Sequence, residues 1–272
     1  CDLIWHVARD DEVTPIISFR RQCRDPFRLA EKKFLEYGVR HARQIVIQTE
    51  VQGNLLARHY GRRDAILIPN FHPVPEQPPR KSAPFKVIWV ANFKKIKRPE
   101  LFIELAARFG NEPGIRFIMA GAPVPDSNWQ RELENRIRVL PNLQYLGHIA
   151  QSEVNRLLAD SHVLVNTSEY EGLPNTFIQA WMREAVVLSL SVNPGGYLDR
   201  PGLGECAGTL ERMAASLREL AGNPLLLDGY GKEASRFARE AFSRGNLNRL
   251  VDLIVSPETA HGGNSAMSGA RA

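Results

Sequence analysis

Residues 162–190, HVLVNTSEYEGLPNTFIQAWMREAVVLSL, combine an apolar run, a polar loop, a helical pattern and a second apolar run. The two apolar runs lack clean alternation, which is typical of parallel strands that are buried on both faces. Between them, Phe177, Ala180 and Trp181 are spaced as the core-facing stripe of a helix. Pro174 suits the first position of that helix, where its missing N–H costs nothing. This stretch therefore predicts a strand–loop–helix–strand unit of an α/β fold.

The same alternation of apolar runs and helical patterns continues along most of the chain. The predicted strands are Leu3–Val7, Gln44–Gln48, Ala65–Ile68, Phe85–Ala91, Ile115–Ala120, Leu143–Leu146, His162–Asn166 and Ala185–Leu190. The predicted helices are Pro99–Phe109, Gln151–Ala159, Pro174–Glu184, Thr209–Ala221 and Leu225–Phe242. Such alternation predicts Rossmann-like, doubly wound parallel sheets, which bind their ligands at the carboxyl ends of the strands.

A proline-rich linker divides the chain into two parts. Residues 69–84 contain six prolines in sixteen positions and cannot form a regular element. We expect residues 1–68 to be the last part of one α/β domain and residues 85–242 to be a nearly complete second one. A helix over 243–256 is expected to close the chain, and the small, polar residues 257–272 predict a disordered tail.

Composition narrows the classes of function. The 272 residues are 43% hydrophobic and 24% charged, as in an ordinary globular protein long enough for two domains. The sequence has no apolar run long enough to span a membrane, and its three widely spaced cysteines suit a reducing cytosol. The net charge of +5 fits an anionic small ligand, an anionic lipid surface or nucleic acid. We expect a cytoplasmic protein, with peripheral membrane contact left open.

Several familiar catalytic motifs are missing from the sequence. It contains no Gly-x-Ser-x-Gly elbow, no phosphate loop ending in Gly-Lys-Ser/Thr and no His-Glu-x-x-His zinc motif. Residues 202–208, GLGECAG, come close to a dinucleotide fingerprint, but they follow Asp-Arg-Pro instead of an apolar strand. We therefore reject a dinucleotide site there and expect no catalytic metal.

A basic stretch follows one predicted strand. In residues 89–100, WVANFKKIKRPE, four cations precede the helix that begins at Pro99: Lys94, Lys95, Lys97 and Arg98. The free amides of a helix N-terminus and adjacent lysines both attract anions. The stretch therefore predicts an anion site, and the alternative is a solvated basic turn.

An acidic loop follows another predicted strand. Glu169 and Glu171 lie between Asn166 and the helix, and Gly172 permits close backbone approach to a ligand. A carboxylate accepts hydrogen bonds in pairs, as the vicinal hydroxyls of a sugar can donate them. The loop thus predicts a sugar contact at Glu171, and the alternative is a glutamate that only caps the helix.

Together, four segments resemble the C-terminal, donor-binding domain of the retaining glycosyltransferase family 4. They are IPNFHPVPE, WVANFKKIKRPELFIELA, LQYLGHI and HVLVNTSEYEGLPNTFIQAWMREAVVLSLSVNPGG, and the resemblance covers residues 43 to about 255. It implies the GT-B fold of two facing Rossmann-like domains. It also implies retaining transfer of a hexose from a nucleoside-diphosphate sugar to a saccharide or lipid-linked acceptor, with no permanent cofactor and no nucleic acid. The alternatives are a sugar-nucleotide epimerase of the same fold and an inert nucleotide-sugar-binding fragment.

The resemblance also assigns roles to residues. Family members hold the donor's diphosphate with a basic pair, and hold its sugar and ribose with two glutamates. Lys97 matches the lysine and Glu171 the first glutamate, so these two are the predicted catalytic residues. Two positions depart from the family, because Asn92 replaces the usual arginine and Gln179 the second glutamate. The predicted donor-binding residues are Ala91, Asn92, Lys95, Gly147, His148, Gly172, Leu173, Pro174, Asn175, Thr176 and Gln179.

Acceptor recognition in this fold belongs to the N-terminal domain. Residues 1–68 are expected to supply only part of that domain. We therefore expect the chain as given to bind nucleotide without transferring sugar at a detectable rate. Correct positioning of the acceptor can lower the activation barrier by roughly 7–11 kcal/mol, and most of that positioning would be missing.

Overall fold

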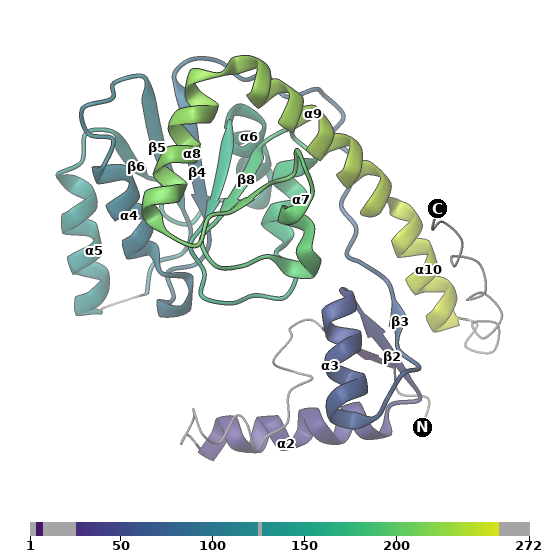
Figure 1. The fold of residues 1–272 in the computed structure, drawn as a ribbon. Helices are drawn as coiled ribbons and strands as arrows, with labels where there is room; N and C mark the ends of the chain where they lie inside the picture. Colours follow the sequence, from purple (N-terminus) through teal and green to yellow (C-terminus); the bar gives the residue numbers. More distant parts are fainter. Residues whose placement is uncertain (1–3, 8–25, 125–126, 256–272) are drawn as a thin grey trace.

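The structure is a computed structural model that describes residues 4–7, 26–124 and 127–255, with the side chains of 4–6 and 26–32 excepted. Figure 1 shows a larger α/β body built on a six-stranded sheet and a smaller one built on a three-stranded sheet. The predicted tail over 257–272 lies outside the described residues. No helix in the described ranges is long and apolar enough to cross a membrane.

The larger sheet is entirely parallel. Its strands lie in the order β6-β5-β4-β7-β8-β9. Their bounds are β4 Phe85–Val90, β5 Ile115–Ala120, β6 Leu143–Tyr145, β7 Val163–Asn166, β8 Val186–Ser189 and β9 Gly204–Cys206. The chain runs outward from β4 in one direction and from β7 in the other, so the strand order reverses between these two neighbours. Loops that follow β4 and β7 therefore meet at the crevice where doubly wound sheets bind ligands.

Helices cover both faces of this sheet (Figure 1). Their bounds are α4 Pro99–Ala107, α5 Asn128–Arg138, α6 Gln151–Asp160, α7 Asn175–Trp181, α8 Leu210–Gly222 and α9 Pro224–Ala241. On one face α4, α5 and α8 bury a core that includes Phe102, Leu133 and Met213. On the other face α6, α7 and α9 bury a core that includes Trp181 and Phe242. The predicted doubly wound α/β architecture is confirmed.

The smaller sheet is also parallel, in the order β1-β2-β3. It consists of β1 Ile4–His6, β2 Gln44–Ile47 and β3 Ile66–Leu67, with helices α2 Pro26–His41 and α3 Glu50–Tyr60. The last helix, α10 Arg244–Val255, returns to this sheet, where Leu253 packs against Val46 and Ile68. The backbone N–H of His72 in the linker also donates to the carbonyl of Phe242 at 3.0 Å. The two bodies are thus joined by both the linker and α10.

Two local predictions were wrong. Pro174 is not the first helical residue, because its φ of −65° and ψ of 124° are extended and α7 begins at Asn175. The helix also ends at Trp181, three residues before Glu184, which adopts a left-handed φ of 59°. The edge strand β9 was not predicted, although the rejected fingerprint contains it. Its Gly204 has a φ of 136°, and a Cβ there would lie 1.9 Å from the carbonyl oxygen of Val187.

Candidate active site

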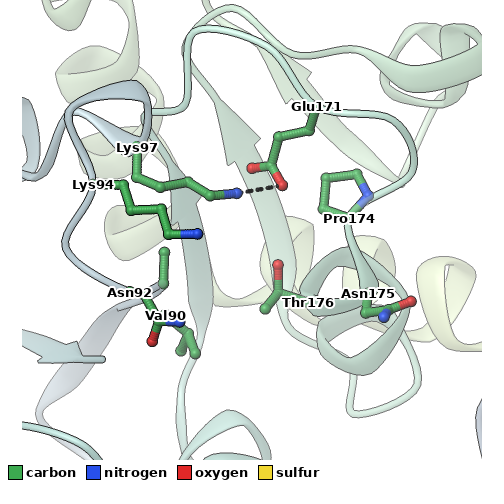
Figure 2. A pocket seen from close by; sticks show the side chains of 9 residues that line it. Val90, Asn92, Lys94, Lys97, Glu171, Pro174, Asn175 and Thr176 are labelled. Carbon is green, nitrogen blue, oxygen red and sulfur yellow. Dashed lines mark ion pairs between the residues drawn. The ribbon is translucent and has the colours of Figure 1, made fainter. Parts of the chain in front are cut away.

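The loops after β4 and β7 bring the two predicted catalytic residues into contact. The β4 loop contains a single 3-10 turn, η2 Lys95–Lys97, before α4 begins. The Nζ of Lys97 lies 2.6 Å from Oε2 of Glu171, as the dashed line in Figure 2 shows. The side chains are 24% and 16% exposed, so the pair is shielded more than an ordinary surface ion pair.

The second oxygen of the Glu171 carboxylate is held from behind. Its Oε1 accepts hydrogen bonds from Nδ2 of Asn166 at 2.8 Å and from the hydroxyl of Ser168 at 2.6 Å. With Lys97 on Oε2, the carboxylate has three donors around it. These contacts fix the orientation of the carboxylate, with Oε1 held by Asn166 and Ser168 and Oε2 held by Lys97.

A hydrogen-bonded joint connects the two loops beneath this pair. The buried Thr167 hydroxyl accepts a hydrogen bond from the indole N–H of Trp89 at 3.0 Å and donates to the carbonyl of Lys97 at 2.7 Å. The backbone N–H of Glu169 donates to the carbonyl of Ile96 at 2.9 Å. These hydrogen bonds fix the position of the turn that carries Lys97 relative to the loop that carries Glu171. Sequence reasoning missed Thr167, because a threonine after a strand carries no signal of such a partner.

Removing the Thr167 hydroxyl should loosen this joint. We expect Thr167→Val to lower the free energy of unfolding by about 1–3 kcal/mol, because it leaves the buried indole N–H of Trp89 and the half-buried carbonyl of Lys97 without this hydrogen-bond partner. Thr167→Ser keeps the hydroxyl and should retain most of the stability. Urea denaturation of both variants checks this, and equal midpoints for valine and wild type would show that the joint contributes nothing.

A cavity of about 240 Å³ opens beside the ion pair. Figure 2 shows Lys94 and Lys97 reaching into it from one side, with Asn175 and Thr176 on the other. Its lining residues are Val90, Ala91, Asn92, Lys94, Lys97, Glu171, Pro174, Asn175 and Thr176. Seven of these were predicted as site residues, and Lys94 had been named in the basic stretch. Asn175 and Thr176 are the first residues of α7, whose N–H groups have no partner inside the helix.

Other predicted donor-binding residues lie outside this cavity. Lys95 is exposed on the 3-10 turn, and His148 is exposed beyond the end of β6. Gly147 uses its carbonyl to accept from the backbone N–H of Gly121 at 2.8 Å. Leu173 and Gln179 are buried, at 5% and 6% exposure. Gly172 is also buried. Roles for these residues in binding a donor stay predictions.

Asn92 has a structural partner in the position where the family usually has an arginine. Its Oδ1 accepts a hydrogen bond from the backbone N–H of Ala122 at 3.2 Å, which ties the loop after β4 to the loop after β5. The neighbouring Gly121 allows this close approach, since a Cβ there would lie 1.7 Å from the carbonyl oxygen of Ala91. The positively charged residues that line the cavity are therefore Lys94 and Lys97.

Comparison with known proteins adds a family to this geometry. The family described as glycosyl transferases group 1 matches residues 84–223, which is more than half of the chain. The chain belongs to this family. The matched residues include both loops of the site, so the crevice described above is part of a group 1 glycosyltransferase domain.

Two curated relatives match part of this chain. Glycosyltransferase 1 domain-containing protein 1 of Xenopus tropicalis is 26% identical over 109 residues, which are 40% of this chain and 31% of that protein. Vi polysaccharide biosynthesis protein VipC/TviE of Salmonella typhi is 32% identical over 104 residues, which are 37% of this chain and 17% of that protein. The chain thus matches less than a third of the length of either relative.

Solved structures establish the fold of this group 1 chain. A variant of TarM from S. aureus, in complex with Fondaparinux, alpha-GlcNAc-glycerol and UDP, has a TM-score of 0.74 at 17% identity, over 93% of this chain and 50% of that one. HepE from Anabaena, in complex with UDP and glucose, has a TM-score of 0.73 at 15% identity, over 93% of this chain and 71% of that one. The predicted GT-B fold is confirmed.

Proposed function

We propose that the protein is a retaining hexosyltransferase of family 4, which transfers a sugar from a nucleoside-diphosphate sugar to an acceptor. The observation that carries this proposal is the contact between Lys97 and Glu171 at the crevice where the strand order reverses. A cation and a carboxylate that meet beside a cavity suit the two ends of such a donor, its diphosphate and its polyhydroxylated ring. Membership of the group 1 family supports the same assignment.

Lys97 would stabilise the leaving diphosphate. Cleavage of the sugar–phosphate bond leaves negative charge on the diphosphate, and preorganised cations and N–H groups at that position lower the barrier. Lys97 and Lys94 both line the cavity, and Asn175 and Thr176, the first residues of α7, line it on the other side. The bond that breaks would therefore lie between these lysines and the start of α7.

Glu171 would hold the hexose. In the free protein its Oε2 is paired with Lys97. The carboxylate thus occupies the place of a donor phosphate at Lys97, and the ammonium group occupies the place of the sugar hydroxyls at Glu171. Donor binding would exchange partners: a phosphate oxygen replaces the carboxylate at Lys97, and sugar hydroxyls replace the ammonium at Oε2. The hydrogen bonds from Asn166 and Ser168 keep the carboxylate in place during this exchange.

The proposal also covers the nucleotide and the acceptor. UDP is the first nucleotide to test, because TarM and HepE were both solved with it. Gly147 and His148 are proposed for the base and Gln179 for the ribose, and a saccharide or lipid-linked molecule is proposed as acceptor. The three-stranded sheet that ends at Leu67 would belong to the acceptor-side domain. A sugar-nucleotide epimerase and an inert nucleotide-sugar-binding fragment are the alternatives.

Slow hydrolysis of the donor tests the reaction without a known acceptor. The protein is incubated with a panel of UDP-α-hexoses, and the released sugar is followed by proton NMR before mutarotation. A retaining enzyme should release UDP and the α-anomer first. Initial release of the β-anomer would contradict retention, an isomerised UDP-sugar would show an epimerase, and an unchanged donor that still binds would show an inert module.

A further inference from the structure

A second cavity lies at the opposite end of the six-stranded sheet from the donor crevice. Its volume is about 170 Å³, and its lining residues are Lys81, His162, Glu184, Pro224, Leu227, Asp228 and Gly231. His162 directly precedes β7, and Glu184 lies two residues before β8, so the cavity is at the amino ends of these strands. Lys81 enters from the proline-rich linker. None of these residues takes part in the proposed transfer.

The amino group of Lys81 is held by one neutral partner. Its Nζ donates a hydrogen bond to the backbone carbonyl of Glu184 at 2.6 Å. The nearby carboxylate of Asp228 pairs with Lys232 instead, and Lys81 forms no ion pair within the described residues. Burial favours the uncharged form of an amine that lacks a counterion. Here burial lowers the pKa of Lys81 to about 7, against a smaller opposing effect of the Glu184 carboxylate.

His162 supplies an uncharged wall beside this amine. Its ring stacks on Phe85, with 4.8 Å between ring centroids, and its Nδ1 accepts a hydrogen bond from the backbone N–H of Lys86 at 3.0 Å. Burial, together with the charges of Lys81 and Lys86, lowers the pKa of His162 to about 4, against an opposing effect of Asp160. The imidazole is therefore neutral at pH 7, with its proton on Nε2.

We propose that Lys81 is a covalent acylation site, at which its amino group attacks the carbonyl carbon of a small acyl thioester. A nitrogen–carbon bond forms, the carbon–sulfur bond breaks, and the sulfur takes up the proton that the nitrogen gives up and leaves as a thiol. A water molecule occupies about 30 Å³ in the liquid, so 170 Å³ leaves room for a short acyl chain. The product is an amide at the point where the linker is attached to the larger body.

Site-resolved labelling tests this proposal on residues 1–272. The folded chain is treated with an acetyl thioester between pH 7 and pH 9, and peptide mass spectrometry gives the rate at each lysine. An exposed lysine with an ordinary pKa near 10.4 is about 1 part in 2,500 neutral at pH 7, against about half for Lys81. Since a less basic amine reacts more slowly once neutral, we expect Lys81 to react about tenfold faster than exposed Lys33. The margin over exposed Lys232 should be larger, because the hydrogen bond to Asp228 raises the pKa of Lys232.

The pH profile and two controls decide the outcome. The rate at Lys81 should level off near pH 8, whereas the rates at Lys33 and Lys232 should keep rising to pH 9. The preference should vanish in urea, and Leu227→Trp, which fills the cavity, should slow Lys81 alone. A Lys81 rate no faster than that of Lys232 in the folded wild type would overturn the proposal, as would a preference that persists in urea.

Discussion

Replacing Lys97 by methionine should weaken UDP binding by about 10- to 100-fold. A hydrogen bond between charged groups contributes about 1.5–3 kcal/mol, and every 1.4 kcal/mol is about tenfold in affinity. The substitution also leaves Glu171 without its cation, so a carboxylate 16% exposed would repel the incoming diphosphate. Isothermal titration calorimetry of wild type and variant measures the loss.

Lys95→Met provides a comparison two residues away. Lys95 carries the same charge on the same turn, but it is exposed and does not line the cavity. We expect its replacement to weaken UDP binding by no more than about threefold, as is usual for an exposed charge. Equal losses for Lys95→Met and Lys97→Met would mean that the basic turn attracts UDP through its overall charge, and that Lys97 makes no specific contact.

Glu171→Gln should separate binding of the nucleotide from use of the sugar. The amide keeps the shape of the side chain but releases Lys97 from its ion pair, so UDP should bind at least as tightly as it does to wild type. The hexose loses a charged acceptor that contributes about 1.5–3 kcal/mol, so turnover of the UDP-sugar should fall at least tenfold. Calorimetry and the hydrolysis assay measure the two effects.

Glu169→Gln is the matched control for this variant. Glu169 lies in the same loop with an exposed side chain, and its hydrogen bond to the carbonyl of Ile96 uses its backbone N–H, which the substitution leaves unchanged. Both UDP affinity and turnover should stay within about twofold of wild type. A parallel loss of UDP and UDP-sugar affinity in Glu171→Gln would place Glu171 against the nucleotide and contradict a sugar contact.

The sequence was sufficient for the architecture of the larger body. Apolar runs such as Phe85–Val90 and Val163–Asn166 need burial on both faces, and only helices on each side of a parallel sheet provide it. Since ligands bind where such strands end, the basic and acidic loops were singled out, and the structure brings Lys97 and Glu171 of these loops into contact. The ion pair itself could not be read from the sequence, because it depends on β4 and β7 becoming neighbours across some seventy residues of chain.

Three of the features that could not be predicted from the sequence are a side-chain partner, a short strand and a helix boundary. The Thr167 joint depends on a tryptophan indole that reaches it from another strand. Strand β9 has three residues and includes Gly204, so neither length nor propensity signals it. A proline φ of −65° suits both the first residue of a helix and the residue just before it. Only the extended ψ of 124° shows that Pro174 precedes α7. Each of these three misses is a feature that tertiary contacts decide. Helices α2, α3 and α5 were also not predicted, although their 16, 11 and 11 residues are long enough to carry a helical pattern.

In the proposed donor complex, a donor phosphate replaces Glu171 as the partner of Lys97. The most direct measurement is a crystal structure of the chain with bound UDP, read at the Nζ atom of Lys97. We expect a phosphate oxygen about 2.7–2.9 Å from Nζ, and a distance from Nζ to Oε2 of Glu171 longer than the present 2.6 Å. UDP bound away from the cavity, or bound with the 2.6 Å ion pair intact and no phosphate at Lys97, would contradict it.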